Sequence, residues 1–170
     1  MTFKSTRLGI GERLLGVGCV LLLVDLFAVP WFAYEPQYRA TAVMLGQSVS
    51  ANGWQTFEVI GPLGLVVCVV GLAIWLLTAT RRSPAVPVVL TTLLMPVSFA
   101  LAVLVAVRVL FDRPSVHLAQ AGGANVIEPR AGAYVGLALT LVIFAGLYLA
   151  LRRDGVAYDD APSTIETLRV

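Results

Sequence analysis

Charged residues are scarce in this sequence. Only 13% of its 170 residues are charged, while 58% are hydrophobic, against roughly 25% and 45–50% in ordinary soluble domains. A chain of this length forms about one domain, which is too small to bury so much apolar surface. Most of that surface must therefore face lipid. The net charge of +2 and the absence of a basic run argue against a nucleic-acid partner.

Residue patterns typical of catalytic and metal sites are also missing. His117 is the only histidine, and Cys19 and Cys68 both lie in apolar segments, which predicts buried free thiols. No group of His, Cys, Asp and Glu has metal-ligand spacing, so we expect neither metal nor cofactor. The chain has no phosphate-binding glycine loop, no serine in a nucleophile elbow and no pair of carboxylates on one helix face. These absences argue against an enzyme.

Four apolar stretches are each long enough to cross a bilayer, which takes about 20 residues. We predict membrane-spanning helices over residues 14–33, 57–79, 86–111 and 133–151. The predicted fold class is all-α, an antiparallel up-down four-helix bundle in residues 1–153, followed by a disordered tail over 154–170. The first stretch could pass for a signal peptide, but Trp31 and Phe32 stand where cleavage would fall, so we predict a retained helix.

The basic residues lie mostly on one side of the predicted spans. Eight lie on the side of the two termini, and four lie on the other side. The eight are Lys4, Arg7, Arg13, Arg81, Arg82, Arg152, Arg153 and Arg169, and the four are Arg39, Arg108, Arg113 and Arg130. Because basic residues favour the cytoplasm, we predict a plasma-membrane protein with both termini cytoplasmic. Aromatic residues form a predicted outer belt: Trp31, Tyr34, Trp54, Phe57 and Tyr134.

The two loops on the outer side are the long ones, over residues 34–56 and 112–132. Alternation of side-chain character over 38–49 predicts a short strand. The segments 115–118 and 125–128 flank a glycine-rich turn. Together they predict a small hairpin or sheet outside the membrane.

Asp25 is the most informative single residue, because it lies within the first predicted span. An ionised carboxylate there costs about 2.5–3.5 kcal/mol on insertion scales unless it is paired or hydrated. Arg108, in the outer part of the third span, is the expected partner, since a long arginine reaches over several ångströms. The leading interpretation is an ion pair that fixes helix packing. The alternatives are a proton or cation site, a protonated Asp25, or a contact with a partner protein.

Two other groups of residues carry weaker signals. Glu58 opens the second span, where a carboxylate complements the helix macrodipole; the alternative is an outer polar network with Arg108 or Arg130. In the fourth span, small residues recur at four-residue spacing, as Gly132, Gly136 and Thr140. Such spacing lets helices approach closely. It predicts packing within the monomer, with homodimerisation or docking on a larger complex as the alternative.

Several short motifs resemble those of a loose group of small four-span proteins from actinobacteria. They are Leu-Phe-x-x-Pro-Trp over 26–31, Trp-x-x-Phe over 54–57, an Arg shortly before a Pro over 108–114, and Arg-x-Gly-Ala-aromatic-x-Gly over 130–136. The resemblance implies four helices and no particular activity, and Asp25 stands where that group usually has an apolar or small residue. The architecture is also similar to that of claudin-like tetraspan proteins, although the first outer loop lacks their cysteine pair.

Taken together, these features predict a non-enzymatic accessory or interaction subunit in a bacterial plasma membrane. Its expected partners are the lipid bilayer and either another membrane protein or a second copy of the chain. The alternative is a small transporter or channel component that uses Asp25 and Arg108. A lipid-modifying enzyme is a third interpretation.

Overall fold

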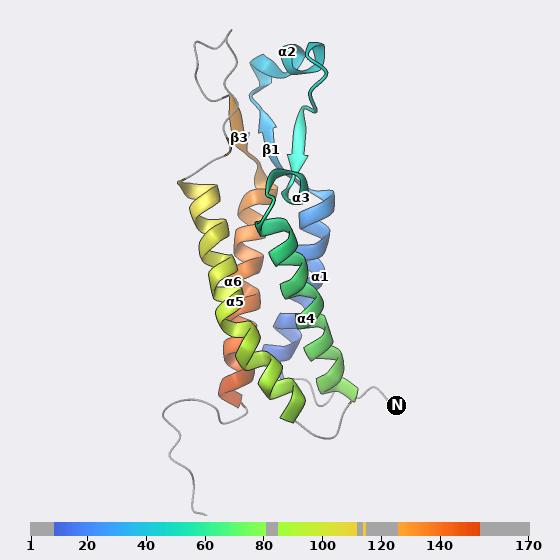
Figure 1. The fold of residues 1–170 in the computed structure, drawn as a ribbon, viewed down its shortest axis with the longest axis vertical. Coiled ribbons are helices and arrows are strands. Elements are labelled where there is room, and N and C mark those ends of the chain that lie inside the picture. Colours follow the sequence, from blue (N-terminus) through green and yellow to red (C-terminus); the bar gives the residue numbers. More distant parts are fainter. Residues whose placement is uncertain (1–8, 81–84, 112–113, 115–125, 154–170) are drawn as a thin grey trace, which may run out of the picture.

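The computed structural model describes residues 9–80, 85–111, 114 and 126–153. Four long helices form most of the described chain, and three short strands and short helices lie at one end of them (Figure 1). The elements in chain order are α1 (Ile10–Ala28), β1 (Pro30–Tyr34), the 3-10 helix η2 (Pro36–Tyr38), α2 (Arg39–Met44), β2 (Ser50–Asn52), α3 (Gly53–Thr56), α4 (Ile60–Thr80), α5 (Ala85–Leu110), β3 (Ile127–Pro129) and α6 (Ala131–Arg153).

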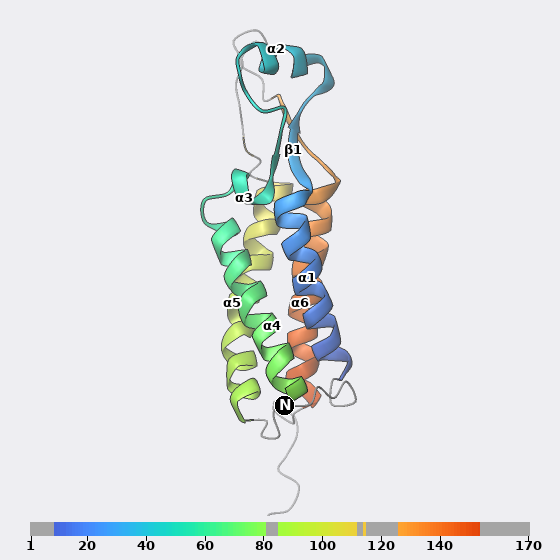
Figure 2. The ribbon, with the colours of Figure 1, turned by 90° about the vertical axis from the view of Figure 1, so that its right-hand side faces the viewer.

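The four long helices run side by side (Figures 1 and 2). Helix α1 packs on α6 and α4, and α5 packs on the same two helices from the opposite corner. Within the described residues, three helices are long and apolar enough to cross a membrane, namely α4, α5 and α6. Helix α1 carries three acidic or basic residues, Glu12, Arg13 and Asp25. The structure is thus that of a multi-pass membrane protein.

The three strands form an antiparallel sheet in the order β2-β1-β3. The fold is therefore mostly helical rather than all-α. The predicted small sheet is confirmed, and it projects from the end of the helices where α1 ends and α6 begins (Figure 1). We call this end of the helices the sheet end. The cap is defined as residues 30–52 and 126–130.

The first helix differs most from its predicted range, since it runs from Ile10 to Ala28 rather than over 14–33. Proline disfavours the α conformation in the residue before it, and Val29 is extended, with φ −100° and ψ 134°. Pro30–Tyr34 then forms the central strand of the sheet. The other three helices begin and end within three residues of their predicted bounds.

The predicted strand over 38–49 is wrong, because this segment contains α2 and the turn that follows it. Ala42 is fully buried beneath Tyr34 and Val126, and this small cluster holds α2 onto the sheet. Six residues are too few to show the period of a helix clearly in sequence. The segment 115–118 and the tail 154–170 lie outside the described residues.

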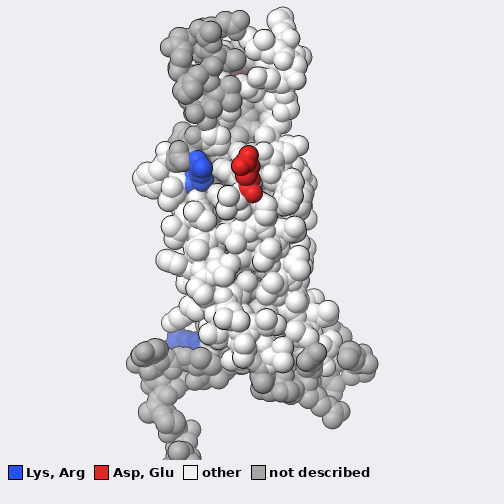
Figure 3. Space-filling model, viewed as in Figure 1, with Lys and Arg blue, Asp and Glu red and all other residues white. Residues whose placement is uncertain are grey.

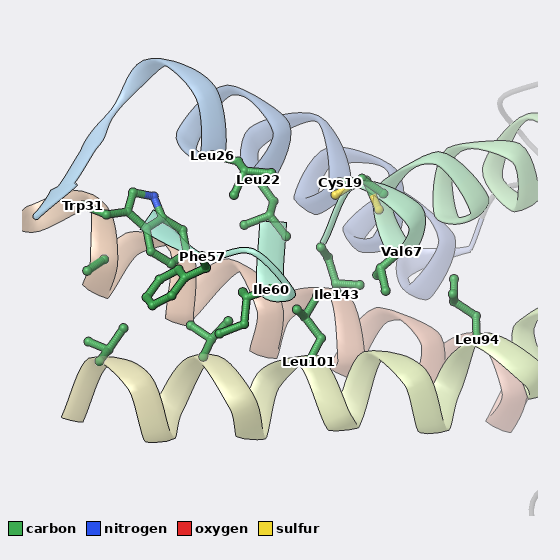
Figure 4. Close-up of a cluster of buried hydrophobic side chains, with 14 of the residues drawn as sticks. Cys19, Leu22, Leu26, Trp31, Phe57, Ile60, Val67, Leu94, Leu101 and Ile143 are labelled. Atoms are coloured by element: carbon green, nitrogen blue, oxygen red, sulfur yellow. The ribbon is translucent and has the colours of Figure 1, made fainter. Parts of the chain in front are cut away.

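The hydrophobic core runs along the whole length between the helices. At the sheet end it closes on Trp31 and Phe57, which point toward each other in Figure 4 with ring centroids 6.0 Å apart. Both side chains are buried rather than part of an interfacial aromatic belt. Cys19 and Cys68 are buried free thiols, as predicted.

Candidate functional site

Three groups of polar and charged side chains of the described residues lie at the sheet end. The first surrounds Asp25 in the last turns of α1. Asp25 is only 3% exposed, and the indole N–H of Trp31 donates to its backbone carbonyl oxygen at 3.3 Å. A Cβ added at Gly136 of α6 would lie 2.8 Å from Asp25 Oδ2 and would overlap the Trp31 ring. The carboxyl group is therefore enclosed between α1, Trp31 and α6.

The predicted pair between Asp25 and Arg108 is wrong. Among the described residues, neither carboxylate oxygen of Asp25 has a hydrogen-bond partner. The physical reason is helix order, because α1 and α5 occupy opposite corners and Asp25 faces α6 instead. A buried polar atom without a partner costs about 1–3 kcal/mol. Asp25 is thus an energetic liability in the described structure.

The second group is a hollow of about 300 Å³ where α4 begins and α5 ends. It is lined by Glu58 and Arg108 together with Thr56, Phe57, Val59, Ile60 and Pro114. Figure 3 shows one basic and one acidic group near each other at this end, on a face with few other charges. Helix α4 begins at Ile60, and the Gly61 N–H donates to the Phe57 carbonyl oxygen at 3.3 Å, so Glu58 lies in the turn that leads into the helix. Of the residues in the alternative outer polar network, Glu58 and Arg108 line the same hollow. Arg130 lines a different hollow.

The third group is a hollow of about 430 Å³ between the cap and the first turn of α6. Its polar lining includes Arg39 of α2, Ser50 of β2 and Arg130, which directly precedes α6. The backbone N–H of Arg130 donates to the Trp31 carbonyl oxygen at 2.8 Å. This bond ties the start of α6 to β1, so the position of Arg130 depends on the sheet.

The small residues of α6 pack within the chain. A Cβ at Gly132 would lie 2.6 Å from the Pro30 carbonyl oxygen, and one at Gly136 would meet Trp31 and Asp25. Thr140 is buried, and its hydroxyl donates to the Leu137 carbonyl oxygen at 2.8 Å. Both glycines therefore serve contacts with α1 and β1 of the same chain.

Two residues central to this end are hard to find from sequence. Trp31 has a local signal, because the proline directly before it predicts the end of the helix. Arg39 has none, since nothing in the sequence joins it to Arg130. Only the sheet register and the position of α2 bring these two arginines to one hollow.

Comparison of the chain with known protein families, curated protein sequences and solved structures finds no match.

Proposed function

We propose that the protein is a non-enzymatic interaction subunit of a bacterial plasma membrane, with four spans and both termini in the cytoplasm. Its cap then lies outside the membrane and contacts the outer part of another membrane protein. The supporting observation is an exposed apolar tip on the cap, formed by Val43, Met44 and Leu45, which are 61%, 85% and 56% exposed.

Helix α1 is suited to be the fourth span despite its ionisable residues. Its 19 residues extend about 28 Å, close to the roughly 30 Å of the hydrocarbon core. Glu12 and Asp25 are buried against the other helices. From Leu14 to Ala28 every exposed residue of α1 is apolar: Leu14, Val17, Val20, Leu21, Val24, Phe27 and Ala28. Lipid would therefore meet only apolar side chains along most of this helix.

The direction of the spans follows from the eight-to-four division of basic residues. It puts the cap outside and the link between α4 and α5 inside. The buried state of Cys19 and Cys68 makes this testable with introduced cysteines, because the native thiols are shielded. In intact cells, Ser48→Cys should react with a membrane-impermeant maleimide, and Arg152→Cys should react only after lysis. The opposite pattern would reject the orientation.

The apolar tip favours a partner anchored in the same membrane. Strand β1 has five residues, so it spans about 17 Å at roughly 3.3 Å per residue. The tip is therefore held beyond the hydrocarbon core yet close to the membrane surface. Three adjacent exposed apolar residues in water are typical of an interaction surface. A partner fixed in the same bilayer would meet this tip at high effective concentration.

Photo-crosslinking in native membranes tests this role. A photoreactive residue at Met44 should give a discrete crosslink to another membrane protein, and the same residue at Ser48 should give a weaker one. Replacing Val43 and Leu45 by serine should remove the Met44 crosslink without lowering the amount of protein in the membrane. Equal crosslinking from both positions, or crosslinks only to lipid, would reject the proposed interaction.

The alternative of a small transporter has less support. It requires Asp25 to face a water-filled path, whereas Asp25 is enclosed by Trp31 and α6 and lines none of the hollows described above. Purified protein in liposomes would decide the matter. Proton or cation flux that Asp25→Asn abolishes would restore this alternative.

A further inference from the structure

The hollow between the cap and α6 has the composition of an anion site. Its two charged lining residues, Arg39 and Arg130, are both basic. The remaining lining residues are Ser50 and the uncharged Val29, Pro30, Ala33, Val49, Ala131 and Gly132. The described carboxylates of the cap, Glu35 and Glu128, are not among them. Two guanidinium groups thus share one concave surface without a lining carboxylate to neutralise them.

Both arginines have N–H donors for which the structure shows no acceptor among the described residues. Arg39 Nε donates to the Tyr34 carbonyl oxygen at 3.3 Å, which positions the side chain over the sheet. Arg130 is partly buried, and its Nη2 is buried without a hydrogen-bond partner among the described residues. A guanidinium has five N–H donors in a planar fork that matches the oxygens of a phosphate or carboxylate. Buried donors are normally satisfied, so the orphaned Nη2 leaves part of the hydrogen-bonding capacity of Arg130 unused.

The first turn of α6 adds to this field. Ala131 and Gly132 line the hollow, and the first N–H groups of a helix have no acceptor within the helix. The positive end of the α6 dipole lies at the same place. This feature alone would not make a site; it strengthens the one that the two arginines form.

The position of the hollow along the helices indicates which anion is best placed to enter it. Pro30 follows the end of α1 by two residues, and Ala131 begins α6, so the hollow lies at the sheet end, which the proposed spans place at the membrane surface. Two exposed aromatic side chains lie at the same end, Trp54 against Phe27 and Tyr134 in the first turn of α6. Exposed Trp and Tyr are typical of the headgroup level. Phosphate is the anion that lipids carry at this level.

We infer that the hollow binds a phosphate group through Arg39 and Arg130, carried either by a phospholipid headgroup or by a soluble phosphate. This inference goes beyond the proposed interaction role and does not depend on the apolar tip of the cap.

The experiment uses the full-length protein in an uncharged maltoside detergent, with two probes. One arm titrates inorganic phosphate by isothermal calorimetry. The other measures retained phosphatidylglycerol by native mass spectrometry, with diacylglycerol as the matched lipid that lacks phosphate. Arg39→Gln and Arg130→Gln should each weaken binding of the active probe about tenfold or more, because each removes a charge-assisted hydrogen bond. Arg108→Gln, at the other hollow, is the control and should bind like the wild type.

Binding of either probe with these losses supports the inference, and the arm that responds identifies the source of the phosphate. Arg130→Lys and Arg39→Lys should recover part of the affinity, which separates loss of charge from misfolding. Thermal unfolding of every variant in the same detergent checks the fold. The inference is overturned if neither probe binds, if the glutamine variants bind as well as the wild type, or if diacylglycerol is retained equally.

Discussion

The contact between α1 and α6 includes close backbone approaches, whereas one large side chain, Trp31, fills much of the junction between the cap and the helices. Where α1 meets α6, a Cβ at Gly11 would lie 2.5 Å from the Ala150 nitrogen and 2.7 Å from the Gly146 carbonyl oxygen. At the sheet end, Trp31 is 1% exposed and contacts Phe57, Gly53, Gly132 and Gly136. The α1–α6 contact at Gly11 thus depends on the absence of a side chain, and the junction of the cap with the helices depends on the presence of one.

This difference predicts which kind of substitution destabilises each region most. Backbone atoms cannot move aside, so added volume should damage the α1–α6 contact even in small amounts. At the Trp31 site the opposite change matters, because the glycines around it leave space that only a large ring fills. Lost volume should therefore damage the junction of cap and helices most.

The largest expected effect comes from Trp31→Ala. Removing a fully buried tryptophan costs about 3–5 kcal/mol in the free energy of unfolding, and here it also removes the indole bond to the Asp25 carbonyl oxygen. Denaturant unfolding in detergent, followed by circular dichroism, measures the change. Trp54→Ala is the matched control, because Trp54 is 39% exposed, and should cost less than half as much. Equal losses would show that Trp31 is not the anchor of the cap.

Gly11→Ala should have the next largest effect, a destabilisation of about 1–3 kcal/mol, because the new methyl group overlaps backbone atoms of α6. The same unfolding assay applies. Gly64→Ala is the control, since its nearest neighbour would be Leu26 Cδ2 at 4.0 Å. That change should be neutral or stabilise by up to about 1 kcal/mol through helix propensity. If both variants lose the same stability, close approach at Gly11 is not what limits the helix contact.

Asp25→Asn should raise the free energy of unfolding by about 1–2 kcal/mol. The amide keeps the shape of the side chain and cannot ionise, so it removes the cost of holding an ionisable carboxyl group in a buried position. Unfolding in detergent with and without the substitution measures it, and Asp25→Ala separates this gain from the effect of lost volume. A clear loss of stability in Asp25→Asn would mean that the carboxyl group has a favourable partner after all.

The smallest effect concerns Asp25 and Arg108 together. Because α1 and α5 lie at opposite corners, the coupling energy in a double-mutant cycle of Asp25→Asn and Arg108→Gln should stay below about 0.5 kcal/mol. A cycle of Trp31→Phe with Asp25→Asn is the positive control and should exceed that value, since those residues are in contact. Strong coupling between Asp25 and Arg108 would restore the ion pair.

The sequence predicts the bounds of the long helices well, but it predicts the elements at the sheet end less well. Apolar runs of about 20 residues are a strong signal, so the bounds of α4, α5 and α6 are close to those predicted. The end of α1 is missed because Pro30–Tyr34 is as apolar as the helix before it, and hydropathy does not separate a buried strand from a helix. Helix α2 is missed because it is short and is held by one buried alanine, Ala42.

The sequence by itself determined the membrane-spanning character of the chain, since hydropathy acts on each segment independently of its neighbours. Buried cysteines follow from the same local pattern, but the strands do not, since most of Pro30–Tyr34 is predicted as helix and the predicted strand over 38–49 is wrong. Only the tertiary structure decided which polar side chains meet: Asp25 faces Trp31 and Gly136 rather than Arg108, and Arg39 shares a hollow with Arg130. The reason is that such meetings depend on which helices are neighbours and on the register of β1 with β2 and β3, and neither is encoded in any one segment.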